Sequence, residues 1–184
     1  MNLKTLLSGA VIASFAAPVA GEGCQTIAEI ACGSDDFQTL CAAVVAAGLD
    51  GTLSEGDFTV FAPTDEAFSK LPEGTVESLL AEEGLATLTD ILLYHVVPIS
   101  VFSSDLSCAG GPAGLVQMAN GKNTRTICCH SCTPAESIFQ KGAGNPRTGN
   151  GSARDNQDSW PQIVATDIEA CNGVIHVVNN VILP

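Results

Sequence analysis

In the first half of the chain, apolar residues recur at the spacing of amphipathic helices. Leu85, Leu88 and Ile91 are the clearest case, because they would share one face of a helix over residues 85–93. Gly48 follows another such pattern, where a glycine commonly ends a helix. The pattern predicts helices over residues 25–31, 37–47, 76–80 and 85–93, and a further helix that begins at Thr64.

The second half of the chain is dominated by short β-branched and apolar runs that are typical of strands. The pattern predicts strands over residues 58–62, 96–102, 115–118, 124–128, 160–165 and 173–183. In the last strand, alternation places Val174, His176 and Val178 on one face and Ile175 and Val177 on the other. Residues 129–157 are rich in glycine and predict a long loop. Helices come first and strands last, so the predicted class is α+β in a single domain.

The first 20 residues predict a secretory signal peptide rather than part of the fold. Lys4 precedes a short apolar run, and small residues end that run near Ala20. An uncleaved anchor is the alternative for this segment. The domain would then cover residues 21–184, in which no run reaches the ~18 apolar residues of a membrane span. The sequence therefore predicts export, with no membrane span after cleavage.

All eight cysteines lie after the predicted signal peptide. They are Cys24, Cys32, Cys41, Cys108, Cys128, Cys129, Cys132 and Cys171. An even number in an exported chain predicts disulfides, although eight cysteines allow about 105 pairings. We expect an N-terminal group of three, which Cys171 would complete, and a second group around the central loop. In that second group, Cys108 should join Cys128, Cys129 or Cys132, so that at least one bond leaves the run 128–132.

The charge of the chain disfavours nucleic acid and anionic membranes as partners. The formal net charge is −13, and residues 22–105 contain fifteen acidic side chains but a single cation, Lys70. Binding to nucleic acid or to an anionic membrane requires clustered Lys and Arg, which this region lacks. We therefore expect no nucleic-acid partner.

Two histidines are the candidates for catalysis, and each has a structural alternative. His95 could act as a general base beside a carboxylate such as Asp65, or could be a buried histidine that fixes a helix-to-strand junction. His176 lies within an apolar strand and is expected to be a packed core or interface residue. The chain has no nucleophile elbow and no phosphate-binding glycine loop. We expect no catalytic residue and no cofactor, so the chain is not expected to be an enzyme.

Two local motifs indicate covalent modification, by disulfide formation or glycosylation, rather than a metal site. Residues 128–132 could be read as a zinc cluster, but the second ligand pair of such sites is missing, and an oxidising compartment favours disulfides. No metal site is therefore expected. Asn150 begins an Asn-Gly-Ser sequon within the predicted loop, which makes it a candidate glycosylation site.

Three segments, in order, resemble the motifs of the fasciclin domain family. They are Phe-Thr-Val-Phe-Ala-Pro-Thr-Asp-Glu-Ala-Phe at residues 58–68, Leu-Leu-Tyr-His-Val-Val at residues 92–97, and Asn-Gly-Val-Ile-His-Val-Val-Asn-Asn-Val-Ile-Leu-Pro at residues 172–184. The resemblance implies a wedge of two β-sheets with a surrounding layer of helices. It also implies adhesion through Tyr94 and His95, and through the pair Asp167 and Ile168. The chain departs from the family pattern in a Cys- and Gly-rich insertion at about residues 128–160.

The resemblance implies a secreted adhesion or matrix module, located outside the cell or in the cell wall or matrix. Its partner would be a cell-surface or matrix protein, a glycan, or a second copy of the chain. The first alternative is an envelope or stress-related protein that disulfides stabilise and that has no specific ligand. The second alternative is a secreted hydrolase that uses His95 or His176.

Overall fold

The computed structural model describes residues 23–54, 56–106, 114–130, 132, 137–147, 153, 156 and 158–184. The predicted signal peptide, Cys108 and Asn150 lie outside these residues, so the expectations for them stay predictions. Among the residues that are described, no helix is both long enough and apolar enough to cross a membrane.

The helices form where the apolar spacing predicts them. They are α1 (Ile27–Gly33), α2 (Gln38–Ala46), α3 (Asp65–Ser69), α4 (Thr75–Leu80) and α5 (Leu85–Leu93), with a 3₁₀ turn over Asp35–Phe37 before α2. Local side chains set two of the starts. Thr26 and Glu29 form a capping box at α1, and the Thr64 hydroxyl accepts the Ala67 N–H at α3. Further 3₁₀ turns cover Thr52–Ser54 and Ser103–Asp105.

A four-stranded sheet forms the centre of the molecule, with the strand order β2-β1-β7-β6. Its strands are β1 (Phe58–Pro63), β2 (Val96–Val97), β6 (Ile163–Ala170) and β7 (Gly173–Val178). The first and last motifs of the chain meet here, because β1 and β7 pair in parallel from Phe58↔Gly173 onward. Gly173 has a φ of 140°, and a Cβ at this position would overlap the Phe58 carbonyl. Only glycine fits this contact, since both the conformation and the space exclude a side chain.

A second sheet, of order β3-β4-β5, lies beside the first. Its strands are β3 (Leu115–Gln117), β4 (Asn123–Cys129) and β5 (Ser137–Lys141). The prediction of a continuous loop over residues 129–157 is therefore wrong for β5, which pairs antiparallel with β4. Four of the five β5 residues are buried, so the strand lacks the polar and apolar alternation that would have revealed it.

Other strand boundaries also differ from the prediction. The last strand, β7, ends at Val178 rather than at residue 183, and β6 begins at Ile163 rather than at residue 160. β2 ends at Val97 rather than at residue 102, directly before Pro98, which has no N–H for a ladder bond. β6 continues to Ala170 rather than stopping at residue 165, and two register shifts interrupt its pairing with β7. Such irregularities break the period-two pattern on which a strand prediction depends.

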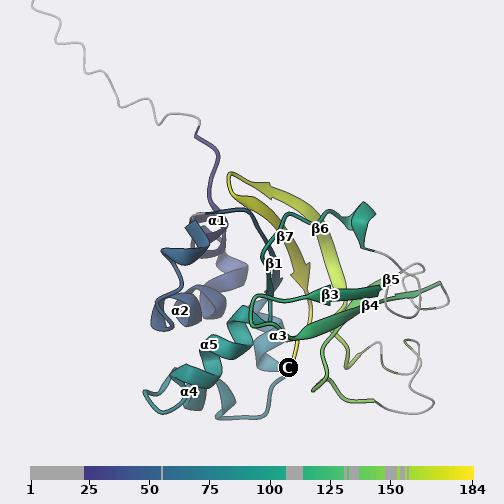
Figure 1. Cartoon of the computed structure of the whole chain (residues 1–184). Helices are drawn as coiled ribbons and strands as arrows, with labels where there is room; N and C mark the ends of the chain where they lie inside the picture. Colours follow the sequence, from purple (N-terminus) through teal and green to yellow (C-terminus); the bar gives the residue numbers. More distant parts are fainter. Residues whose placement is uncertain are drawn as a thin grey trace, which may run out of the picture.

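The helices lie on one side of the four-stranded sheet and the second sheet lies on the other (Figure 1). Three apolar clusters hold these layers together. The largest lies between the helices and the four-stranded sheet and includes Ile175 and Val177. The second lies between the two sheets and includes Phe61 and Val178. The predicted alternation along the last strand is thereby confirmed, because its two faces enter different clusters. The third cluster lies against β4 and β5 and includes Phe139 and Trp160.

Among the described residues, one disulfide joins the two ends of the domain and two others close short local loops. Cys171 pairs with Cys24, and Cys32 pairs with Cys41, which matches the expected N-terminal group. In the second group, Cys129 pairs with Cys132, and Cys128 is also disulfide-bonded. The bonding of Cys129 and Cys132 to each other leaves neither thiolate for zinc.

Candidate functional site

Tyr94 and His95 close the C-terminal end of α5 and connect it to both sheets. The Tyr94 hydroxyl donates to the Asn123 carbonyl at 2.7 Å and accepts the Ala143 N–H at 3.4 Å. The backbone carbonyl of His95 accepts the N–H of Phe61 in β1 at 2.9 Å. The helix end is thus tied to β1, to β4 and to the segment that follows β5.

The His95 ring joins this helix end to the C-terminal segment. Its Nδ1 lies 2.8 Å from the Ile91 carbonyl, and its Nε2 lies 2.9 Å from the Ile182 nitrogen. Because an N–H can only donate, Nε2 must be the acceptor and Nδ1 must carry the proton. The ring is 2% exposed, and burial lowers the pKa of His95 from 6.5 to about 4. His95 is therefore neutral, with both nitrogens used in the fold.

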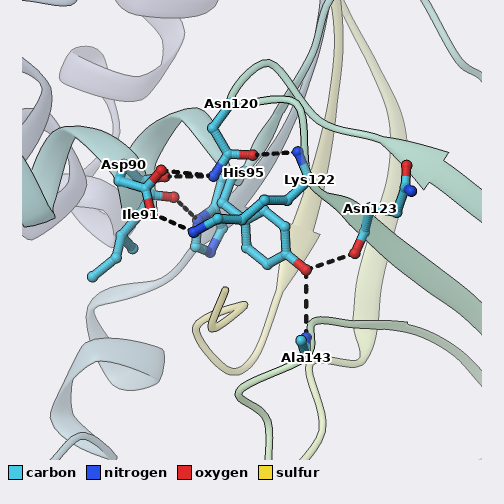
Figure 2. Close-up of polar contacts among 8 residues, drawn as sticks. Asp90, Ile91, His95, Asn120, Lys122, Asn123 and Ala143 are labelled. Atoms are coloured by element: carbon cyan, nitrogen blue, oxygen red, sulfur yellow. Dashed lines mark hydrogen bonds and ion pairs between the residues drawn. The ribbon is translucent and has the colours of Figure 1, made fainter.

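A polar network holds the turn between β3 and β4 against the same helix end (Figure 2). The Lys122 ammonium lies 2.8 Å from Asp90 Oδ2, and the Asn120 amide donates to Asp90 Oδ1 at 3.0 Å. The hydrogen bond from Lys122 is the main cause of the lowered pKa of Asp90. The Asn120 side chain also accepts the Lys122 N–H at 3.1 Å, which closes the turn on itself. The network fixes α5 to the second sheet.

The expectation that Tyr94 and His95 contact a partner requires correction. They are 1% and 2% exposed, so neither side chain can reach another molecule while the domain stays folded. Their hydrogen bonds join α5, β1, β4 and the C-terminus, which explains why a Tyr-His pair occupies this junction. The structural alternative for His95 describes its position, and Asp65 is engaged elsewhere, accepting the N–H groups of Gln38 and Thr39.

Asp167, which the family resemblance implies in adhesion, makes hydrogen bonds within the fold. It lies within the irregular part of β6, at a φ of 58° that non-glycine residues seldom adopt. Its carboxylate accepts the backbone N–H of Ser103 at 2.7 Å and the Ser103 hydroxyl at 2.5 Å. The hydroxyl hydrogen bond is the main cause of the lowered pKa of Asp167. The side chain thus holds the Ser103–Asp105 turn against β6, and its contact with a partner stays a prediction.

His176 supports this arrangement from the core. Its Nδ1 accepts the Asp167 N–H at 3.3 Å, and its Nε2 donates to the Val101 carbonyl at 2.9 Å. The ring is fully buried and lies 5.5 Å from the Phe61 ring, and burial lowers its pKa. His176 is therefore a neutral core residue, as its place in the strand predicted.

The exposed part of this region is the outer strand β6 and the groove beside it. Ile168 is half-buried against the helical core, whereas Val164 is 54% exposed. Together with the ends of α1 and α3, they border a groove of about 580 Å³. Asp35, Asp36 and Glu66 line the same groove and are exposed. We refer to this feature as the β6 groove.

Sequence reasoning missed the β6 groove and also a cluster of cations on the second sheet. Val164 lies where strand alternation breaks down, so its exposure carried no signal. The cations did leave a signal, because five of the seven Lys and Arg residues follow residue 120. That uneven distribution marks a second face with a different charge.

Comparisons with known proteins show which family shares the three motifs. The fasciclin domain model matches residues 35–184. Protein sll1483 of Synechocystis sp. is 37% identical over 189 residues, covering 100% of this chain and 84% of the relative. Transforming growth factor-beta-induced protein ig-h3 of Sus scrofa is 31% identical over 160 residues, covering 86% of this chain and 19% of the relative.

A solved structure has the same fold. It is a FAS1 domain pair from the insect cell adhesion molecule fasciclin I, with a TM-score of 0.54 at 16% identity, covering 79% of this chain and 43% of that one. At this identity the likeness concerns the fold alone. It confirms the predicted α+β architecture of two sheets with surrounding helices.

Proposed function

Because this chain belongs to the fasciclin domain family, we propose that it is a secreted adhesion or extracellular-matrix module. Its partner is a cell-surface or matrix component. Support comes from the family and from fasciclin I, an insect cell adhesion molecule with the same fold. The hydrolase alternative loses its two candidate bases, because His95 and His176 are buried and use both ring nitrogens in the fold.

The exposed apolar surface of β6 is the observation that carries this proposal. β6 is the outermost strand of its sheet, with β7 on one side. Val164 is 54% exposed on it, beside the half-buried Ile168. Val164 and Ile168 line the same groove, so an apolar side chain of a partner could pack against both, whereas the buried Tyr94 and His95 cannot reach a partner.

The charge around the groove indicates the chemistry of the partner. Asp35, Asp36 and Glu66 are exposed along the rim, and Lys70 is the nearby cation, 3.7 Å from Glu66. The groove therefore fits an extended protein segment with an apolar side chain flanked by Lys or Arg. The apolar residue would cover Val164, while the cations would face the rim and accelerate association at low salt.

A cell-adhesion assay with one matched pair of variants tests the proposal. Cells and matrix proteins are tested for binding to the immobilised domain, and the domain in solution is tested on a glycan array. Val164→Glu should reduce adhesion by about tenfold or more, because it places a charge in the contact. Val45→Glu is the control, since Val45 is 58% exposed on α2 and does not line the groove. Both variants should melt like the unchanged domain.

The possible outcomes separate the site from the function. Adhesion that both variants retain would reject the β6 groove and leave the adhesion module standing. Adhesion confined to the glycan array would reject a protein segment as the occupant. A domain that binds neither cells, matrix proteins nor glycans would favour the ligand-free envelope protein.

A further inference from the structure

One face of the second sheet collects cations on a chain that is otherwise strongly acidic. Arg125 in β4 and Lys141 in β5 are directly opposite each other in the antiparallel register. Arg147 follows β5, and these three cations line one groove of about 420 Å³. Ile127 and the exposed Leu115 add apolar surface to it. We refer to this feature as the cationic groove.

Lys141 is the unusual member of this group, because it is a cation that is only 7% exposed. Its ammonium donates to the Gly142 carbonyl at 2.8 Å and lies 5.6 Å from the centre of the Trp160 ring. Among the described residues, no carboxylate lies within 4.0 Å of any of the three cations, since the ion pairs there are those of Lys70 and Lys122. Burial, followed by repulsion from Arg147 and Arg125, lowers the pKa of Lys141.

This arrangement destabilises the domain when no anion is bound. Like charges that are directly opposite across two strands destabilise a sheet, and a buried cation without a counter-charge adds a desolvation cost. The same arrangement is favourable when an anion occupies the groove, because Arg side chains bind planar and tetrahedral oxyanions through paired N–H donors. The counter-charge that the described residues do not provide would then come from a ligand.

We propose that the cationic groove binds the sulfate or carboxylate group of an acidic extracellular glycan. Its volume lies within the ~300–1,000 Å³ of small-molecule sites, which leaves room for sugar units beside the acidic group. A long polyanion does not fit, because three cations cannot offset the repulsion from a chain of net charge −13. The inference rests on the extracellular setting of the proposed function, but it concerns a site separate from the β6 groove.

The single tryptophan of the chain provides a direct test. Trp160 is beside Lys141, so its fluorescence should change when an anion enters the groove. The purified domain is titrated with a sulfated disaccharide, a uronate disaccharide, a neutral disaccharide, inorganic sulfate and inorganic phosphate. At least one acidic disaccharide should bind and the neutral one should not, and binding should weaken as salt rises.

Substitutions locate the binding and separate it from folding. Arg125→Gln and Arg147→Gln, both at exposed positions, should each weaken binding by about tenfold or more. Lys70→Gln is the control cation outside the groove and should change binding by less than about twofold. Lys141→Met should also weaken binding but leave the melting temperature unchanged or higher, because it removes an uncompensated charge.

Three results would overturn the proposal. They are binding of inorganic anions without the acidic disaccharides, binding that survives both Arg substitutions, and no fluorescence or calorimetric response to any acidic disaccharide. None of these would affect the proposed function, since adhesion at the β6 groove is measured through Val164→Glu.

Discussion

Acidification should destabilise the domain through its buried histidines, and His95 allows the effect to be calculated. The pKa of His95 is about 4 in the folded chain against 6.5 for an unburied histidine. Between these values the unfolded chain binds the extra proton, so stability is complete above 6.5 and falls as pH falls toward 4. The whole shift corresponds to about 3 kcal/mol of unfolding free energy, of which about 2 kcal/mol is lost by about pH 5.

The physical cause is the pair of hydrogen bonds that the neutral ring makes. Protonation of Nε2 would turn an acceptor into a donor facing the N–H of Ile182, at a residue that is only 2% exposed to water. The two carboxylates with lowered pKa values, Asp90 and Asp167, titrate below this pH range. The pKa values of Asp90 and Asp167 lie below 3.8, so their stabilising contributions are lost only at lower pH.

Urea unfolding at about pH 7.5 and about pH 5 measures the effect. His95→Gln should be less stable by about 1–3 kcal/mol at the higher pH, because one hydrogen bond is lost. Its further loss at the lower pH should be about 2 kcal/mol smaller than that of the unchanged domain, since a titrating group is gone. The remaining pH dependence includes His176, whose pKa burial also lowers.

A substitution at an exposed histidine, His130→Gln, controls for the change of residue type. If His95→Gln loses as much stability between the two pH values as the unchanged domain, the neutral, doubly bonded His95 is wrong. A His95→Gln domain that stays folded and loses a hydrolytic activity would instead restore the enzyme alternative.

Three further substitutions test the contacts that position these sites. Asp167→Ala should lower the unfolding free energy by about 2 kcal/mol or more in a denaturant melt, since it removes the acceptor for Ser103 at a left-handed position; an unchanged melt would contradict this. Replacing Cys24 and Cys171 together by serine should cost up to about 5 kcal/mol, because the bond closes a loop with a sequence separation of 147; calorimetry measures the loss. Gly173→Ala should prevent the parallel pairing of β7, and a circular dichroism spectrum like that of the unchanged domain would refute this.

The division of charge between the two layers bears on how the module could work. The helical layer carries the acidic β6 groove, whereas the second sheet carries the cationic groove. A partner protein and an acidic glycan would then bind at separate places. The sequence analysis also allowed a second copy of the chain as the partner, and the acidic face of one copy could then contact the cationic face of another. Sedimentation of the free domain at low and high salt would detect this association.

Local pattern was sufficient for much of the fold. Residues 85–93 form a helix with the predicted bounds, because amphipathic spacing and glycine punctuation act over a few neighbouring residues. The last strand divides its side chains between two cores as its alternation predicted, since a strand has a fixed period of two. The three motifs were sufficient for the family and thereby for the architecture.

The candidate site was beyond the reach of local pattern. Tyr94 and His95 are typical of a functional pair in sequence, yet their partners Asn123 and Ile182 come from distant segments and bury them. The Asp167 carboxylate accepts a hydrogen bond from Ser103, which lies 64 residues earlier in the chain.

The sequence alone determined the helices, the order of the motifs, the abundance of disulfides and the acidic charge of residues 22–105, because each depends on composition or on neighbours in the chain. The tertiary structure decided which polar groups are exposed, and it placed Arg125 opposite Lys141. Strand register and burial set those outcomes, and both depend on contacts between residues that are far apart in the sequence.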